Sequence, residues 1–85
     1  MPMKKVDAKY NHILIKIGLN VAYYRKLRSL TQEQLAEMVD LSRNTIANVE
    51  NADKFHSMAL GTLLKIADAL DIPVKKLFDF RDEED

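Results

Sequence analysis

The stretch TQEQLAEMVDLSRNTIANVEN, residues 31–51, decides the fold of this 85-residue chain. It opens on Thr31 followed three residues later by Gln34. This spacing fits a capping box, in which a hydroxyl and an amide side chain satisfy two free backbone N–H groups at the start of a helix. Apolar residues then recur at helical spacing as far as Val39. The beginning of the stretch therefore predicts a helix over about 32–39.

The rest of the stretch predicts a sharp turn and a second helix over about 42–51. Asp40 breaks the apolar pattern and tolerates left-handed backbone angles better than most residues, and Ser42 is a good N-cap. Within residues 32–51 the helix-turn-helix pattern requires five apolar residues and one small residue where the two helices cross. These are Leu35, Val39, Leu41, Ile46 and Val49, with Ala36 as the small residue. The spacing is typical of a DNA-binding helix-turn-helix, although any helical bundle would also bury the five apolar positions.

Apolar periodicity predicts three more helices, one before this unit and two after it. A helix that ends near Ser29 would turn one face inward, formed by Leu14, Ile17, Val21, Tyr24 and Leu27. Gly18 within it marks either the start of the helix or a point of close packing. Residues 51–58 predict a loop, and Ala59–Leu70 a helix with an inward stripe of Leu60, Leu63, Leu64, Ala67 and Leu70. Pro73 suits the start of a short fifth helix over 74–78.

The expected architecture is all-α: a compact five-helix bundle that contains the helix-turn-helix. We expect a lead-in over residues 1–11, the domain over 12–78 and an acidic tail over 79–85. The formal net charge is zero, but residues 1–78 hold twelve Lys and Arg against eight Asp and Glu. Residues 79–85 hold five acids and one Arg. The folded part is thus mildly basic, which permits contact with phosphate.

Several classes of function find no support in the residues. Cysteine is absent, and His12 and His56 lie far apart without ligand spacing, so we expect no metal site. No serine has a base at suggestive spacing, and no glycine-rich phosphate loop is present. We therefore expect no enzyme activity, no cofactor and no small-molecule ligand. No apolar run approaches about 18 residues, so we expect a cytoplasmic protein that does not enter the membrane.

Three segments in combination resemble a known family. TQEQLA and SRNTIANVE, with LLKIADAL behind them, are similar to the phage Cro and repressor-type helix-turn-helix proteins, also called XRE-like. The resemblance runs from about Ile17 to Phe78 and implies the lambda-repressor-like fold, whose second and third helices form the DNA-reading unit. The chain departs from the family at Ser29 and Asp40, where glycine is usual. The loop over 51–58 also lacks the family's common Gly-Lys and Pro-Ser elements.

The resemblance implies a role for each matching residue. Base edges in the major groove would be contacted by Arg43, Asn44 and Asn48. Gln32 would contact a phosphate, and Ser42 and Thr45 would contact phosphates or the thymine methyl group. A further phosphate contact is expected from Lys54, in the loop where the chain departs from the family. Arg25 and Glu50 match an ion pair that braces the first helix against the third.

The chemistry of the third helix supports these roles independently. With Ile46 and Val49 turned inward, the outward side carries Arg, Asn, Ala and Asn and no acid. Arg can chelate guanine, and Asn can pair with adenine. We expect a transcriptional regulator, a repressor, that binds a double-stranded DNA operator. The alternative is a protein-interaction module, such as an antitoxin or adaptor, which would place acids or apolar groups on that outward side.

A homodimer is expected because one small domain reads too few base pairs for specificity, and two copies on adjacent half-sites would correct this. Two apolar surfaces exceed what a minimal core needs. One is the C-terminal segment with Leu77, Phe78 and Phe80, which we favour, and the other is the run Ile13–Ile15.

Overall fold

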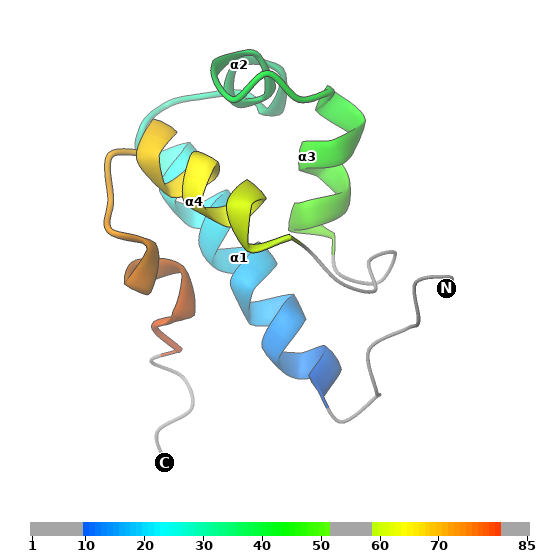
Figure 1. Cartoon of the computed structure of the whole chain (residues 1–85), viewed down its shortest axis with the longest axis vertical. Coiled ribbons are helices and arrows are strands. Elements are labelled where there is room, and N and C mark those ends of the chain that lie inside the picture. The colour runs from blue at the N-terminus through cyan, green and yellow to red at the C-terminus, as the bar shows by residue number, and fades with distance from the viewer. Residues whose placement is uncertain (1–9, 52–58, 81–85) are drawn as a thin grey trace.

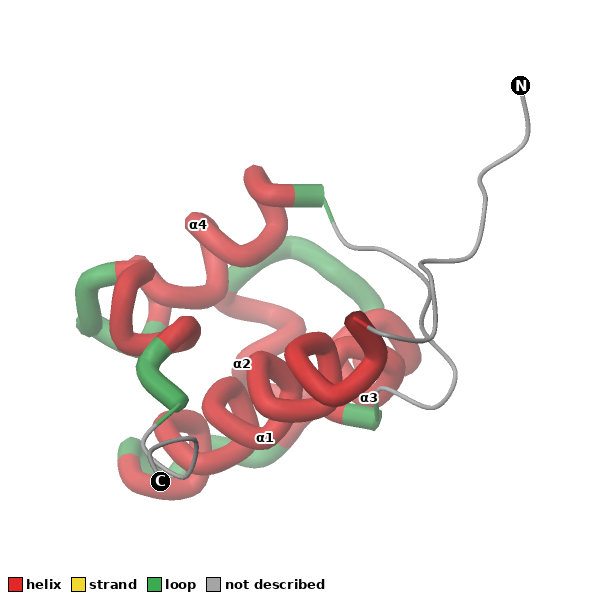
Figure 2. Tube along the Cα trace, turned by 90° about the horizontal axis from the view of Figure 1, so that it is seen from below, coloured by secondary structure: helices red, strands yellow, loops and turns green. Residues whose placement is uncertain are grey.

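The computed structural model describes residues 10–51 and 59–80 of the chain. They form four α-helices and one short 3-10 helix, without a strand in these two ranges: α1 (Asn11–Leu27), α2 (Gln32–Met38), α3 (Arg43–Glu50), α4 (Leu60–Ala69) and η3 (Val74–Phe78). Figure 1 shows α4 lying across α1, with α3 on one side of the pair, η3 on the opposite side and α2 above them. The view at right angles in Figure 2 likewise separates α1 and α4 into two layers. The all-α class is confirmed.

The expected fifth α-helix is wrong in type, because the segment forms a 3-10 helix of five residues. Pro73 precedes it with extended angles, and its carbonyl accepts from the backbone N–H of Lys76 at 2.9 Å, an i to i+3 hydrogen bond. The segment is tied to α1 by Asn20, whose Nδ2 donates to the carbonyl of Leu77 at 2.9 Å. Leu77 is fully buried, so η3 serves to close the core.

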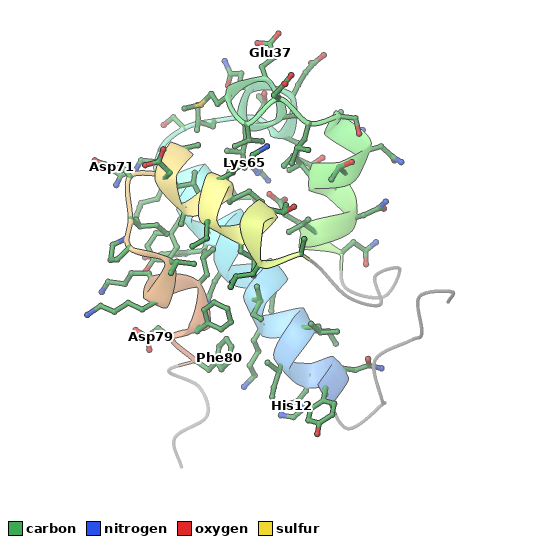
Figure 3. All side chains as sticks on the ribbon, viewed as in Figure 1. His12, Glu37, Lys65, Asp71, Asp79 and Phe80 are labelled. Atoms are coloured by element: carbon green, nitrogen blue, oxygen red, sulfur yellow. The ribbon has the colours of Figure 1, made fainter. Side chains whose placement is uncertain are left out.

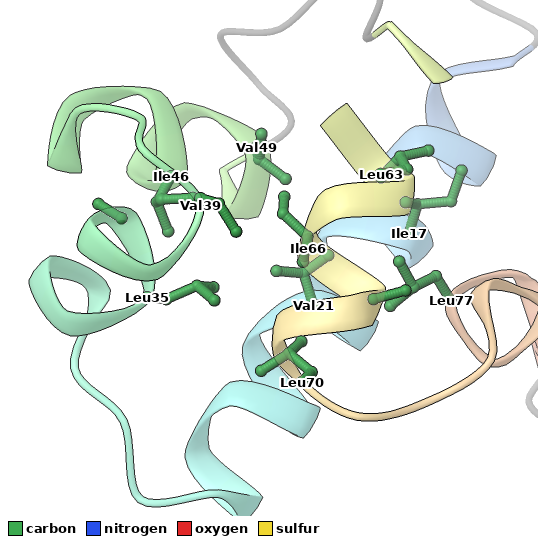
Figure 4. Close-up of a cluster of buried hydrophobic side chains, with 12 residues drawn as sticks. Ile17, Val21, Leu35, Val39, Ile46, Val49, Leu63, Ile66, Leu70 and Leu77 are labelled. Carbon is green, nitrogen blue, oxygen red and sulfur yellow. The ribbon is translucent and has the colours of Figure 1, made fainter. Parts of the chain in front are cut away.

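The core is formed where α1 and α4 meet the helix pair α2–α3 (Figure 4). The buried side chains that define it include Ile17, Val21, Leu35, Ala36, Val39, Ile46, Val49, Leu63, Ile66, Ala67, Leu70 and Leu77. All the positions that the helix-turn-helix pattern assigns to the interior are buried, except Leu41, which is half-buried and packs against this cluster. The periodicity of residues 32–51 therefore predicted their burial.

Two of the inward stripes predicted from apolar spacing are partly wrong. Leu27, at the end of α1, is 60% exposed, and on α4 Leu60 and Leu64 are 61% and 47% exposed. Ile66, which the predicted stripe omits, is fully buried. The inward side of α4 is rotated towards Ile66, and the elements that pack against this helix are η3 and α2.

Three helices end in the same way, with a non-glycine residue at positive φ. Ser29, Asp40 and Asp71 have φ of 60°, 59° and 60°. After α2, the N–H of Leu41 donates to the carbonyl of Ala36 at 2.9 Å and that of Asp40 to Glu37 at 3.3 Å. This is the Schellman pattern, which satisfies the last carbonyls of a helix. The residue after each positive φ is apolar and packs against the core: Leu30, Leu41 and Ile72.

Gly18 lies inside α1, and its role is close packing. A Cβ on Gly18 would lie 2.5 Å from the carbonyl oxygen of Val49 and 3.2 Å from that of Glu50. Atoms cannot approach that closely, so only glycine lets the end of α3 lie directly on α1. This contact fixes the direction in which α3 projects from the bundle.

Candidate nucleic-acid interface

The start of α3 is set by Ser42. Its hydroxyl oxygen accepts from the backbone N–H of Thr45 at 3.0 Å, which makes Ser42 the N-cap. The hydroxyl groups of the two residues also lie 2.9 Å apart, within hydrogen-bond distance. The corresponding cap of α2 is a complete capping box between Thr31 and Gln34, with distances of 3.0 and 2.8 Å. Both helix starts are therefore fixed by local hydrogen bonds.

The outward side of α3 is built from polar residues. Ile46 and Val49 anchor the helix in the core, and Arg43 and Asn44 on the opposite side are exposed. Asn48, one turn further on, is half-buried. None of the three polar side chains makes a hydrogen bond to another residue in the described ranges. Their donors and acceptors are therefore available to a partner outside the bundle.

Arg25 and Glu50, which the resemblance pairs, lie in direct contact. Arg25 Nε donates to Glu50 Oε2 at 2.7 Å, and Arg25 Nη2 donates to Glu50 Oε1 at 3.0 Å. The two side chains are only 10% and 7% exposed. Arg25 Nη1 also donates to the carbonyl of Leu30 at 2.8 Å. The guanidinium thus connects α1, α3 and the turn that leads into α2.

Gln32 touches the same ion pair, a contact that the sequence reasoning missed. Its Nε2 donates to Glu50 Oε1 at 3.0 Å, so the carboxylate accepts from α1 and from α2. Gln32 is half-buried at the first position of α2. The two residues are 18 positions apart on different helices, and no periodicity within one helix signals such a contact. Lys54, the fourth predicted phosphate contact, lies outside the described residues.

A shallow groove lies between the ends of α2 and α4. It is lined by three apolar residues, Met38, Val39 and Ala69, and by three charged residues, Asp40, Lys65 and Asp68. Figure 3 shows Lys65 between the two helices and Glu37 pointing away from α2. The groove lies at the opposite end of α2 from Gln32 and does not include residues of α3. No helix in residues 10–51 or 59–80 has both the length and the apolar character needed to cross a membrane.

Known proteins resemble the chain in sequence and in structure. Residues 21–77 match the helix-turn-helix family HTH_3. Control protein C.SmaI of Serratia marcescens is 43% identical over 75 residues, which cover 88% of this chain and 87% of that protein. The immunity repressor of Bacillus phage phi105 is 41% identical over 61 residues, which cover 72% of this chain and 41% of the repressor.

A solved structure agrees with these matches. The restriction-modification controller protein C.AhdI of Aeromonas hydrophila superposes with a TM-score of 0.75 at 33% identity, over 81% of this chain and 97% of its own. The matched family region contains α2, the turn and α3, together with Arg25 and most of the core. The chain therefore belongs to the HTH_3 family of helix-turn-helix proteins, the XRE-like group that includes Cro and phage repressors.

Proposed function

We propose that this protein is a transcriptional regulator that binds a double-stranded DNA operator in a sequence-specific manner and acts as a repressor. In the proposed complex, α3 enters the major groove with its N-terminal turn foremost, and α2 lies across the sugar-phosphate backbone. The observation that carries the proposal is the outward side of α3: exposed Arg43 and Asn44, half-buried Asn48, and no acid among them.

These three side chains have the donors and acceptors that base edges require. Arg43 can donate two hydrogen bonds to O6 and N7 of guanine, and each Asn can pair with N6 and N7 of adenine. A helix side that only faced water would be expected to carry Glu and Lys, as other exposed positions of the chain do. We therefore assign base reading to Arg43, Asn44 and Asn48.

Phosphate contacts are proposed for Gln32, Ser42, Thr45 and Lys54. Both hydroxyls at the start of α3 are exposed or half-exposed, and the hydrogen bond between them leaves one hydroxyl proton free to donate to a phosphate oxygen. Phosphate contacts set the position of the protein on the duplex and carry no sequence information.

The protein is proposed to bind as a homodimer on two half-sites about one helical turn apart. The sequence offered two candidate dimer surfaces. In the C-terminal one, Leu77 is fully buried and cannot contribute, whereas Phe78 is exposed. The N-terminal one is larger than expected. Ile15, Leu19, Tyr23 and Leu27 follow one another at four-residue spacing on α1, and each is at least 40% exposed.

Three similar proteins support a regulatory role. Control protein C.SmaI and the controller C.AhdI each match over most of their own length, and the phi105 relative is an immunity repressor. Repression needs nothing beyond occupation of a promoter. The test is a reporter gene placed behind an operator selected from a random pool of DNA duplexes. Its expression should fall when the protein is present, and a rise would show activation instead.

The alternative, an interaction module such as an antitoxin or adaptor, draws support from the exposed apolar row of α1. It does not account for the outward side of α3, where it would place acids or apolar groups. Selection of bound sequences from a random duplex pool separates the two functions. Recovery of one motif with two-fold symmetry supports DNA binding by a dimer. Binding without any enriched sequence, or no binding, would reject sequence-specific regulation.

A further inference from the structure

Glu50 occupies a position that bracing alone does not explain. Its Oε1 accepts from Arg25 Nη2 and from Gln32 Nε2, both at 3.0 Å, while Oε2 accepts from Arg25 Nε at 2.7 Å. An Arg–Glu pair holds two helices together without the third contact. The added bond connects the pair to Gln32, one of the proposed phosphate contacts.

The contact restricts the side chain of Gln32 in a specific way. A carboxylate only accepts hydrogen bonds, so it must face the NH2 end of the amide and never the carbonyl end. The two N–H groups on Nε2 lie in one plane, so directing one at Glu50 Oε1 fixes the direction of the other. A flipped amide would turn its carbonyl oxygen towards the phosphate, and two acceptors repel one another.

The charge of Glu50 makes this arrangement costly for a protein that binds DNA. An acid at the end of the reading helix opposes binding to a polyanion. Arg25 offsets this charge and holds the carboxylate in place through two hydrogen bonds. We infer that Glu50 is a positioning residue, which orients the amide of Gln32 so that its second N–H meets a DNA phosphate. The inference rests on the proposed function.

The test uses a double-mutant cycle on the selected operator. Four proteins are compared by fluorescence anisotropy: the parent chain, Glu50→Ala, Gln32→Ala and the double variant. Titrations are run at a temperature at which far-UV circular dichroism shows every protein folded. If only charge mattered, Glu50→Ala would tighten binding in both backgrounds, because it removes an acid.

If Glu50 positions Gln32, the effect of Glu50→Ala on DNA affinity should depend on whether Gln32 is present. In the parent chain, Glu50→Ala should weaken binding about 3- to 10-fold, the size of one typical net hydrogen bond. Gln32→Ala should weaken binding to a similar extent. In the Gln32→Ala background, Glu50→Ala should no longer weaken binding, because no amide remains to be oriented.

A conservative variant keeps the test decisive if Glu50→Ala does not fold. Glu50→Asp retains the charge and draws the carboxylate back by one methylene, so it too should weaken binding in the parent and not in the Gln32→Ala background. Equal weakening in both backgrounds would show that Glu50 is only structural. An unchanged affinity of Gln32→Ala would also overturn the inference while leaving the proposed function intact. A parent chain that selects no DNA sequence would overturn both.

Discussion

The two sides of α3 differ in packing and in polarity. The side towards α1 is closely packed: its backbone carbonyls lie so near Gly18 that a Cβ there would collide with them. This side also holds the nearly buried Arg25–Glu50 ion pair and two core side chains, Ile46 and Val49. The side away from α1 has exposed polar groups without hydrogen-bond partners in the described ranges, such as Arg43. The inner side fixes the position of the helix, and the outer side has hydrogen-bond donors and acceptors that can contact another molecule.

This difference implies that stability and DNA binding can be changed separately within eight residues. Changes on the inner side should lower the free energy of unfolding, whereas changes on the outer side should alter only the affinity for DNA. Glu50, which belongs to the inner side and is proposed to orient Gln32, is the one exception.

The largest effect is expected for Arg25→Ala, which leaves the Glu50 carboxylate without its main partner in a place where it is 7% exposed. Removing one member of a buried pair costs about 3–5 kcal/mol. The lost hydrogen bond to the carbonyl of Leu30 adds to this cost. Urea denaturation followed by circular dichroism measures the loss. A change below about 1 kcal/mol would place the pair among surface ion pairs of little consequence.

Gly18→Ala should be the next most damaging change. The added methyl group would lie 2.5 Å from the carbonyl oxygen of Val49, which is backbone and cannot rotate away. Overpacking of this kind costs about 1–3 kcal/mol. The matched control is Gly61→Ala in α4, where nothing lies within 4 Å of the new Cβ. That variant should be more stable than the parent by up to about 1 kcal/mol, because alanine is the better helix former. Equal effects of the two variants on the unfolding midpoint would contradict the close approach of α1 and α3.

Arg43→Ala should leave the unfolding midpoint unchanged and cost about 1–3 kcal/mol of binding on the selected operator. It should also relax the preference at one base position. Lys75→Ala removes the same charge from η3, on the opposite side of the bundle from α3 (Figure 1), and should keep the full base preference. A loss for Arg43→Ala that is as large on random DNA as on the operator would show that Arg43 contacts only phosphate.

The predictions from sequence were most accurate for features that depend on residues adjacent along the chain. The caps at Thr31 and Ser42 and the turn at Asp40 are local, and each has the predicted geometry. The burial of α2 and α3 was also predictable, because the spacing of their apolar residues admits only one inward side. Gly18 left two possibilities open, and only the position of Val49 in space decides between them.

The sequence failed where the answer depends on which flank of a helix its neighbours cover. Leu60 and Leu64 are as apolar as Leu63, but no helix covers their flank in the described ranges. Leu77 was assigned to a dimer surface because its place in the core depends on how the chain turns after Pro73. The contact between Gln32 and Glu50 joins two helices across the turn and has no signature in either segment.

The smallest effect is expected for Asp40→Gly in the turn between α2 and α3. Asp40 has φ of 59°, where a side chain beyond Cα is strained, and its charge lies beside the last carbonyls of α2. Glycine removes both penalties but gives the unfolded chain more freedom, so the net gain should be about 0.5–1 kcal/mol. Asp40→Asn is the control, since it removes the charge and keeps a side chain that tolerates this conformation. An equal gain for Asn would mean that charge, not backbone strain, limits the turn. Asp40 is exposed and precedes the N-cap of α3, so the operator motif selected by Asp40→Gly should match that of the parent. A changed motif would show that the turn helps to set the angle of α3 on the DNA, and that its geometry is part of the reading side.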